Sequence, residues 1–203
     1  MDGERHYQAY GKDDKREHGV AVCLRKSVHV EFENVDWGNE RMIAIDCKIA
    51  GVKFRICSAY APQNGRPLSE KSVFYHDLEK FIVAKDCHRK LILLGDFNSF
   101  CSAFHVNCNF TGKSIDQLGE YESHESGDLF IDFMTKLKLG SLATCFDHKW
   151  SHRATHYNNN GQTTRVYDHI ISADWLRKFT RDCRVRNGMQ ISSILWYNLV
   201  QID

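Results

Sequence analysis

Residues 91–99 read LILLGDFNS, an apolar run that leads directly into polar residues. The run at 91–94 predicts a buried strand, and Gly95 marks a turn signal at its end. Successive strand residues point to opposite faces, so Asp96 and Asn98 share one face if the extended conformation continues. An acid and an amide in this position are suited to bind a water or a metal ion beside an anionic substrate. A simple turn is the alternative, because Asp, Asn and Gly all favour turns.

The composition predicts one soluble globular domain. The chain has 203 residues, enough to bury a substantial core, and 42% of them are hydrophobic and 26% charged. The net charge of +1 gives no indication of a strongly basic nucleic-acid-binding protein, although a local basic face stays open. No apolar stretch reaches the length of a membrane span, so we expect no membrane partner.

The eight cysteines predict reduced thiols in an intracellular protein. None are paired as Cys-x-x-Cys, and no signal peptide precedes them. Several lie in apolar runs, where a free cysteine acts as a small hydrophobic residue. The even count also allows four disulfides, which is the alternative.

Hydrophobic periodicity predicts a mixed α/β protein with packed sheets rather than a parallel doubly wound sheet. Residues 1–18 are polar and predict a solvated loop, and 101–123 predict a long surface loop. Apolar residues at helical spacing predict one helix at 69–85 and a second over 129–137 that ends near Gly140. The remaining pattern predicts a short helix at 174–179, a hairpin turn at 50–51, and strands at 19–24, 41–49, 52–60, 91–94, 141–146, 164–172 and 182–186.

Two further motifs place polar side chains at strand positions. Tyr60 closes an apolar strand two residues before a proline. Asp168 and His169 lie inside the otherwise apolar run at 166–171. A charged side chain inside such a strand needs a partner or a function, so Asp168 is a candidate site residue.

Four motifs together resemble those of the endonuclease/exonuclease/phosphatase superfamily, namely GVAV at 19–22, YAP at 60–62, GDFN at 95–98 and DHII at 168–171. Their order and spacing fit over about residues 17–193. More narrowly, they resemble the apurinic-type endonuclease domain of non-LTR retrotransposons. The resemblance implies an α/β (α+β) fold, a two-sheet DNase I-like sandwich flanked by helices, with the active site where the sheets meet at one edge. It also implies Mg²⁺-dependent hydrolysis of DNA phosphodiesters, with Mn²⁺ as an alternative ion.

The same resemblance implies roles for individual residues. Asp96 would orient or deprotonate the attacking water, and Asn98 would hydrogen-bond that water or a phosphate oxygen. These two residues would also hold the metal ion. Tyr60 would donate to the phosphate, where charge grows in the transition state. Asp168 would orient a catalytic histidine near the C-terminus.

Two departures from the superfamily pattern predict impaired activity. The superfamily carries an asparagine and a metal-binding glutamate on its first two strands, and nothing ahead of 19–22 matches them. The terminal Ser-Asp-His is also missing, because 191–197 read ISSILWY. His169 is no replacement, since its side chain should point away from the face of Asp168. We therefore expect residues 1–203 to form a single domain of this kind that lacks its first strands and is incomplete at both ends.

A polar hairpin at 152–165 is the predicted DNA interface. The resemblance places a hairpin that helps choose the DNA target here, and Asn, Gln and Arg side chains can reach base edges or phosphates. The alternative is an ordinary polar surface hairpin. The residues expected to contact DNA are Arg153, Thr155, Asn158, Asn159 and Arg165.

Three histidines of the same region, His148, His152 and His156, repeat every fourth residue. On a helix this spacing would line up metal ligands, and zinc needs a closed set of four. The neighbouring tryptophan, threonine and glycine-containing turn argue against a helix, so a zinc site is only a minor alternative.

Three functions are compatible with the sequence. The first is a Mg²⁺-dependent DNA endonuclease of retrotransposon origin. It would be a monomer that acts in the nucleus, with a reverse transcriptase domain in a longer parent protein. The second is a catalytically dead remnant or a DNA-binding module on the same scaffold. The third is a phosphatase or phospholipid phosphodiesterase of the superfamily, ranked last because no residue points to a lipid.

Overall fold

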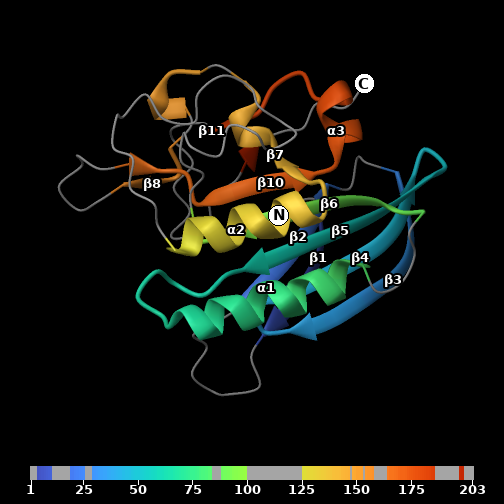
Figure 1. The fold of residues 1–203 in the computed structure, drawn as a ribbon. Coiled ribbons are helices and arrows are strands. Elements are labelled where there is room, and N and C mark those ends of the chain that lie inside the picture. The colour runs from blue at the N-terminus through green and yellow to red at the C-terminus, as the bar shows by residue number, and fades with distance from the viewer. Residues whose placement is uncertain are drawn as a thin grey trace.

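A six-stranded mixed sheet forms the centre of the computed structural model (Figure 1). The structure describes residues 4–10, 19–25, 29–83, 88–99, 125–146, 148–152, 154–157, 164–185 and 197–198. The strands of the central sheet are, in spatial order, β3 (Val30–Asn39), β4 (Met42–Ile49), β5 (Val52–Tyr60), β6 (Lys90–Asp96), β10 (Asp168–Ser172) and β7 (Gly140–Ser141).

Three two-stranded sheets and three α-helices accompany the central sheet in the described part of the chain. The small sheets pair β1 (Glu4–Tyr10) with β2 (Gly19–Arg25), β8 (His156–Tyr157) with β9 (Thr164–Arg165), and β11 (Arg184–Val185) with β12 (Tyr197–Asn198). The helices are α1 (Leu68–Val83), α2 (Glu125–Lys136) and α3 (Asp174–Phe179), with 3-10 turns at η2 (Leu142–Thr144) and η3 (Trp150–His152). None of the described helices is both long and apolar enough to cross a membrane.

Both faces of the central sheet are buried, which explains the continuous apolar run at 91–94. In Figure 1, α1 and α2 cover one face, and the β1–β2 hairpin lies behind the sheet. Leu93 packs into the core under the helices with Phe130, whereas Ile92 packs into the core on the opposite face with Val22. A strand covered on both faces carries apolar side chains at consecutive positions rather than at alternate ones.

The hairpin and crossover around β5 bring the later site residues together. β4 and β5 are antiparallel and joined at Ala50 and Gly51, both at positive φ (49° and 78°), as a tight hairpin turn requires. β5 then connects through α1 to β6, which runs parallel to it. The carboxyl ends of β5 and β6 therefore meet at the same edge of the sheet, and this edge holds the candidate site.

The structure corrects several element boundaries. Residues 4–10 form β1, which pairs with β2, whereas the whole segment 1–18 was expected to be a loop. β3 had no prediction, because its mostly exposed, charged side chains hide the alternation of a strand. The predicted strand 164–172 is interrupted between β9 and β10, and the strand expected at 141–146 is only β7 followed by η2. The predicted loop at 101–123 lies outside the described residues.

The second helix also ends earlier than expected. The sequence predicted an end near Gly140, but α2 stops at Lys136 and Gly140 already belongs to β7. Lys138 takes the left-handed conformation (φ 53°), and the N–H of Leu139 donates to Met134 O at 2.8 Å. This is a Schellman termination in which a lysine occupies the position that usually favours glycine.

The five cysteines that the structure describes are free thiols. This confirms the expectation of reduced cysteines for these positions and contradicts the alternative of four disulfides. They are Cys23, Cys47, Cys57, Cys145 and Cys183.

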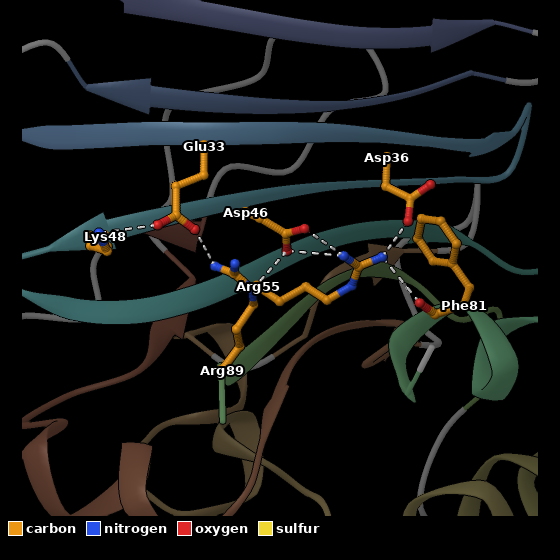
Figure 2. Close-up of polar contacts among 7 residues, drawn as sticks. All are labelled: Glu33, Asp36, Asp46, Lys48, Arg55, Phe81 and Arg89. Atoms are coloured by element: carbon orange, nitrogen blue, oxygen red, sulfur yellow. Dashed lines mark hydrogen bonds and ion pairs between the residues drawn. The ribbon is translucent and has the colours of Figure 1, made fainter. Parts of the chain in front are cut away.

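A buried ion-pair cluster fixes the end of α1 to the start of β5 (Figure 2). Arg55 is 3% exposed, and its Nη1 lies 2.9 Å from both carboxylate oxygens of Asp46. Its Nη2 donates to Asp36 Oδ2 at 2.7 Å and to Phe81 O at 3.1 Å. Phe81 belongs to the last turn of α1, whose carbonyls have no partner within the helix. Arg55 therefore caps α1 while it neutralises two acids.

The same cluster continues through Arg89 and Glu33. Nη1 of Arg89 lies 2.6 Å from Glu33 Oε2, and Nζ of Lys48 lies 3.3 Å from Glu33 Oε1. The adjacent Arg89 guanidinium lowers the pKa of Glu33. Each described acid in this cluster thus has a cation beside it.

Candidate active site

Three predicted site residues lie in one row across neighbouring strands. Tyr60, the last residue of β5, is in register with Asp96, the last residue of β6. Asp96 is in turn opposite Asp168, the first residue of β10. Directly opposite residues of a sheet present their side chains on the same face. Residues that are far apart in the sequence thus form one polar row at the sheet edge.

Gly95 allows this edge to form. Its φ is 154°, and a Cβ atom placed there would lie 1.8 Å from the carbonyl oxygen of Ala59. Only a residue without a side chain permits the two backbones to approach this closely. The glycine of the GDFN motif is therefore a requirement of the close contact between β5 and β6, next to the Tyr60–Asp96 pair.

Asn98 reaches the site through a turn rather than through strand alternation. The extended conformation ends at Asp96, and Asn98 has a positive φ of 45°. Its backbone N–H donates to Asp96 Oδ1 at 2.8 Å, and its Nδ2 donates to Ala61 O at 2.9 Å. Of the two possibilities that the sequence left open, the turn is correct for the backbone. The turn nevertheless holds Asn98 directly against Asp96.

The two aspartates of the row experience an unfavourable environment for charge. Burial raises the pKa of Asp96, against a hydrogen bond from the Asn98 N–H and the charge of His156. Burial raises the pKa of Asp168 to about 7, and the charge of Asp96 adds to this shift, while a Thr155 hydrogen bond opposes it. Like charges directly opposite on neighbouring strands repel each other. Strongly perturbed acids are concentrated at functional sites, because catalytic groups need pKa values that are matched to their task.

Comparison with solved structures identifies the fold. The endonuclease domain of TRAS1, a telomere-specific non-LTR retrotransposon, matches 95% of this chain and 75% of its own with a TM-score of 0.62 at 12% identity. The 3′ phosphatase NExo from Neisseria, bound to product DNA hairpin, matches 94% of this chain and 75% of its own with a TM-score of 0.66 at 19% identity. The chain has the endonuclease/exonuclease/phosphatase fold. This confirms the predicted DNase I-like α/β sandwich.

A further solved structure agrees with this fold, and two curated proteins are distant relatives in sequence. TDP2 from D. rerio, complexed with single-strand DNA product, matches 96% of this chain and 72% of its own with a TM-score of 0.55 at 14% identity. Craniofacial development protein 2 from Bos taurus is 23% identical over 194 residues, which cover 95% of this chain. The chain spans about a third of the length of the curated relatives it matches, 32% and 33%. No protein-family model matches it.

Thr155 has a positioning role in this example of the fold. It was predicted to contact DNA, but it is only 5% exposed. Its hydroxyl oxygen accepts the backbone N–H groups of Tyr167 at 2.9 Å and Asp168 at 3.2 Å. Thr155 thus ties the residue before β8 to the first residue of β10, and we assign it to holding Asp168.

The other predicted DNA contacts stay predictions. Arg153, Asn158 and Asn159 lie outside the described residues. Arg165 is in β9, opposite His156. The bond from Asp168 to Thr155 places the start of β8 next to the polar row, and the part of the β8–β9 hairpin in DNA contact stays a prediction.

His169 is a structural residue, as the alternation of β10 predicted. It is 1% exposed and packs against Phe130 under the helices, on the face opposite Asp168. Its Nδ1 lies 2.8 Å from Ser141 Oγ, and its Nε2 lies 3.1 Å from Val166 O and 3.2 Å from Ser99 O. Burial lowers the pKa of His169 to about 4. The ring is therefore neutral, with Nε2–H donating to carbonyls and Nδ1 accepting from the serine.

Arg41 is a site neighbour that sequence reasoning missed. Its Cζ lies 5.7 Å from the centroid of the Tyr60 ring, and its Nη1 donates to Tyr60 O at 3.3 Å. The N–H of Tyr60 donates in return to Arg41 O at 2.9 Å. Glu70, at the start of α1, lies 3.5 Å from Arg41 Nη2. The pairing of Met42 with Ala59 is the signal that could have found Arg41, because it places the preceding residue beside Tyr60.

Proposed function

We propose that this chain carries the phosphodiesterase site of a Mg²⁺-dependent DNA endonuclease of retrotransposon origin. The observation that supports it is the row of Tyr60, Asp96 and Asp168 on one face, with Asn98 held against Asp96. A fold shared with a retrotransposon endonuclease domain and with a DNA-bound phosphatase supports the same substrate class. Such a protein would act in the nucleus, as a monomer or as part of a longer protein with a reverse transcriptase domain.

The residues of the row have complementary capacities for phosphodiester hydrolysis. Asp96 accepts a hydrogen bond from Asn98 with Oδ1, and no described residue bonds Oδ2, which can orient an attacking water. Tyr60 carries a phenolic O–H that can donate to a phosphate oxygen as charge grows there. Asp168, with a pKa near 7, can hold or release a proton near neutral pH.

Asp96 and Asn98 are the residues that would hold Mg²⁺. Asn98 donates with its amide nitrogen to Ala61 and keeps its carbonyl oxygen as an acceptor. No group of three or more His, Cys, Asp or Glu able to hold a metal occurs in the part of the chain that the structure describes. Mg²⁺ is commonly held by one or two carboxylates together with substrate phosphates, so this small oxygen set fits it. When bound, the ion would neutralise phosphate charge and stabilise the leaving oxygen.

A DNA-binding module without catalysis is the second candidate. It is favoured by residues 191–197, which lack the Asp-His that the superfamily resemblance implies. On this alternative, the β8–β9 hairpin and its arginines would bind phosphates, and the polar row would be a remnant. The two candidates differ in turnover, not in DNA affinity.

Nicking of supercoiled plasmid in the presence of Mg²⁺ tests the proposal. We expect wild-type protein to convert the plasmid to the open-circular form, and Asp96→Asn to slow this roughly 100-fold or more, the usual loss for one transition-state contact. Asp77→Asn is the matched control, because Asp77 is an exposed aspartate on α1. Equal nicking by wild type and Asp96→Asn would refute the proposal that this site is an endonuclease active site. DNA binding without nicking would instead support the second candidate.

A further inference from the structure

One histidine lies beside the acidic pair, although neither the polar row nor the superfamily resemblance includes it. His156 is the first residue of β8, and it pairs with Arg165 of β9. The preceding residue, Thr155, is bonded to the backbone of both Tyr167 and Asp168. Thr155, the residue before His156, is thus bonded to Asp168, the first residue of β10. This bond fixes the backbone of His156 close to the polar row.

Tyr167 holds the imidazole ring of His156 close to the turn formed by Asp96, Phe97 and Asn98. The two ring centroids are 5.2 Å apart, with an interplanar angle of 41°. Tyr167 is itself tied to the turn, because its carbonyl accepts the N–H of Phe97 at 2.8 Å. Phe97 lies between Asp96 and Asn98. In agreement with this position, the charge of His156 acts on Asp96 and opposes the rise in the pKa of its carboxyl group.

His156 is also available to a ligand, unlike other histidines near the site. Its side chain is exposed, and among the described residues no hydrogen bond to its imidazole nitrogens is found, only the ring contact with Tyr167. His169 is buried on the other face with partners at both ring nitrogens. His148 has its Nε2 2.6 Å from Asp182 Oδ1. Among these three, His156 alone presents an unused N–H donor next to the aspartates.

We propose that His156 is a phosphate-contacting residue of this site, whose imidazole N–H donates to a non-bridging oxygen of the DNA phosphate bound at the polar row. The inference rests on the proposed function, and it adds a donor that the superfamily pattern does not supply. Two aspartates facing one another repel an anionic substrate. A hydrogen-bond donor on an exposed side chain beside this pair offsets that repulsion.

Plasmid nicking by His156→Ala and His156→Gln tests the contact through turnover. We expect His156→Ala to lower kcat/KM roughly 10- to 100-fold, less than the loss of a fully buried donor. His156→Gln keeps an N–H donor and should recover part of that loss. His76→Gln, at an exposed histidine of α1 on the far side of the sheet, should nick as wild type does. Unchanged thermal unfolding of the variants shows that packing is not the cause. Equal kcat/KM for His156→Ala and wild type would overturn the inference and leave the endonuclease standing.

A measurement without turnover separates this inference from the proposed function. The side-chain ¹H–¹⁵N signals of the histidines are recorded in EDTA, and His156 is assigned from the signal missing in His156→Gln. We expect a short DNA duplex to shift the His156 signal and to leave His76 unshifted. If the protein does not nick but this shift occurs, the phosphate contact holds and the endonuclease fails. If His156 does not move when the DNA binds, the contact is refuted whatever the activity.

Discussion

The two ends of β5 place acids in opposite situations. Near its start, Arg55 bonds both carboxylate oxygens of Asp46 from the neighbouring strand β4, and it also caps α1. Asp46 is 4% exposed. At its end, Tyr60 leads to two aspartates that face each other across β6 and β10. We call the first end balanced, because an arginine neutralises its acid, and the second end unbalanced, because burial and the facing Asp96 raise the pKa of Asp168 to about 7. A fold tolerates an unbalanced pair where function needs it, so the difference separates the scaffold from the site.

The largest expected effect is at the balanced end. Arg55→Ala should lower the free energy of unfolding by about 3–5 kcal/mol, because it leaves Asp46 as a buried charge without its main partner. Urea denaturation measures this difference. Lys136→Ala is the control, since it removes an exposed pair with Glu79 and should cost under about 1 kcal/mol. Similar losses in the two variants would show that the cluster is no more important than a surface ion pair.

Gly95→Ala should have the next largest effect, by forcing β5 and β6 apart beside the site. The added Cβ would meet Ala59 O at 1.8 Å, so we expect a loss of about 3 kcal/mol in unfolding free energy, together with loss of nicking. Gly51→Ala is a matched control, because Gly51 also has a positive φ but nothing within 4 Å of its Cβ position. That variant should lose about 1 kcal/mol and keep its activity. A well-tolerated Gly95→Ala would mean that the close approach is dispensable.

Asp168→Asn should stabilise the protein at the unbalanced end, and the gain should depend on pH. The pKa of Asp168 is about 7 in the folded protein and 3.8 as a reference, so folding takes up a proton between these values. Stability is therefore present at low pH and lost as pH rises from about 4 to 7. The asparagine removes this loss and should raise the unfolding free energy by about 1–3 kcal/mol at pH 8. Nicking should fall at the same time.

His169 gives the Asp168→Asn experiment a sharper readout. Its folded pKa of about 4 lies below the reference of 6.5, so it contributes stability that is lost as pH falls from about 6.5 to 4. The two pH dependences oppose each other in wild type. Denaturation curves of Asp168→Asn across this range should show stability rising with pH, because the Asp168 dependence no longer opposes that of the histidine. An unchanged pH dependence would mean that burial in the fold does not raise the pKa of Asp168.

The sequence revealed the row but not what supports it. Tyr60, Asp96 and Asp168 could be predicted because each lies at a strand position with a strong apolar pattern beside it. Arg41, the site position of His156 and the bonds from Thr155 to the strand of Asp168 could not, because these contacts depend on register and hairpin geometry that no local pattern contains.

Two features of the fold were hidden by their polarity. β1 and β3 carry many polar side chains, so periodicity gave no strand signal for them. Arg55 and Asp46 are charged residues inside strands, and their pairing becomes visible only when the strands lie in register. Asn98 reaches Asp96 through a left-handed turn and not through a continued strand, and periodicity alone could not decide between the two.

Substitution of Arg41 has the smallest expected effect, and it tests how Tyr60 is held at the unbalanced end. Its guanidinium lies over the Tyr60 ring and bonds the Tyr60 carbonyl, so it should orient the phenol toward the phosphate. We expect Arg41→Ala to lower kcat/KM about tenfold, equivalent to about 1.4 kcal/mol, as measured by plasmid nicking. Arg41→Lys keeps the charge but loses the planar stack and should recover little.

A double-mutant cycle with Tyr60→Phe decides whether Arg41 acts through the tyrosine. If it does, Arg41→Ala should change kcat/KM little once the phenol is absent, because the oriented group is already gone. A full tenfold loss in the Tyr60→Phe background would instead assign Arg41 to direct contact with DNA. Arg41 would then not be a positioning residue for Tyr60. The salt dependence of DNA binding supplies the check, since removing a direct phosphate contact lowers the slope by about one, whereas removing a positioning residue leaves the slope unchanged.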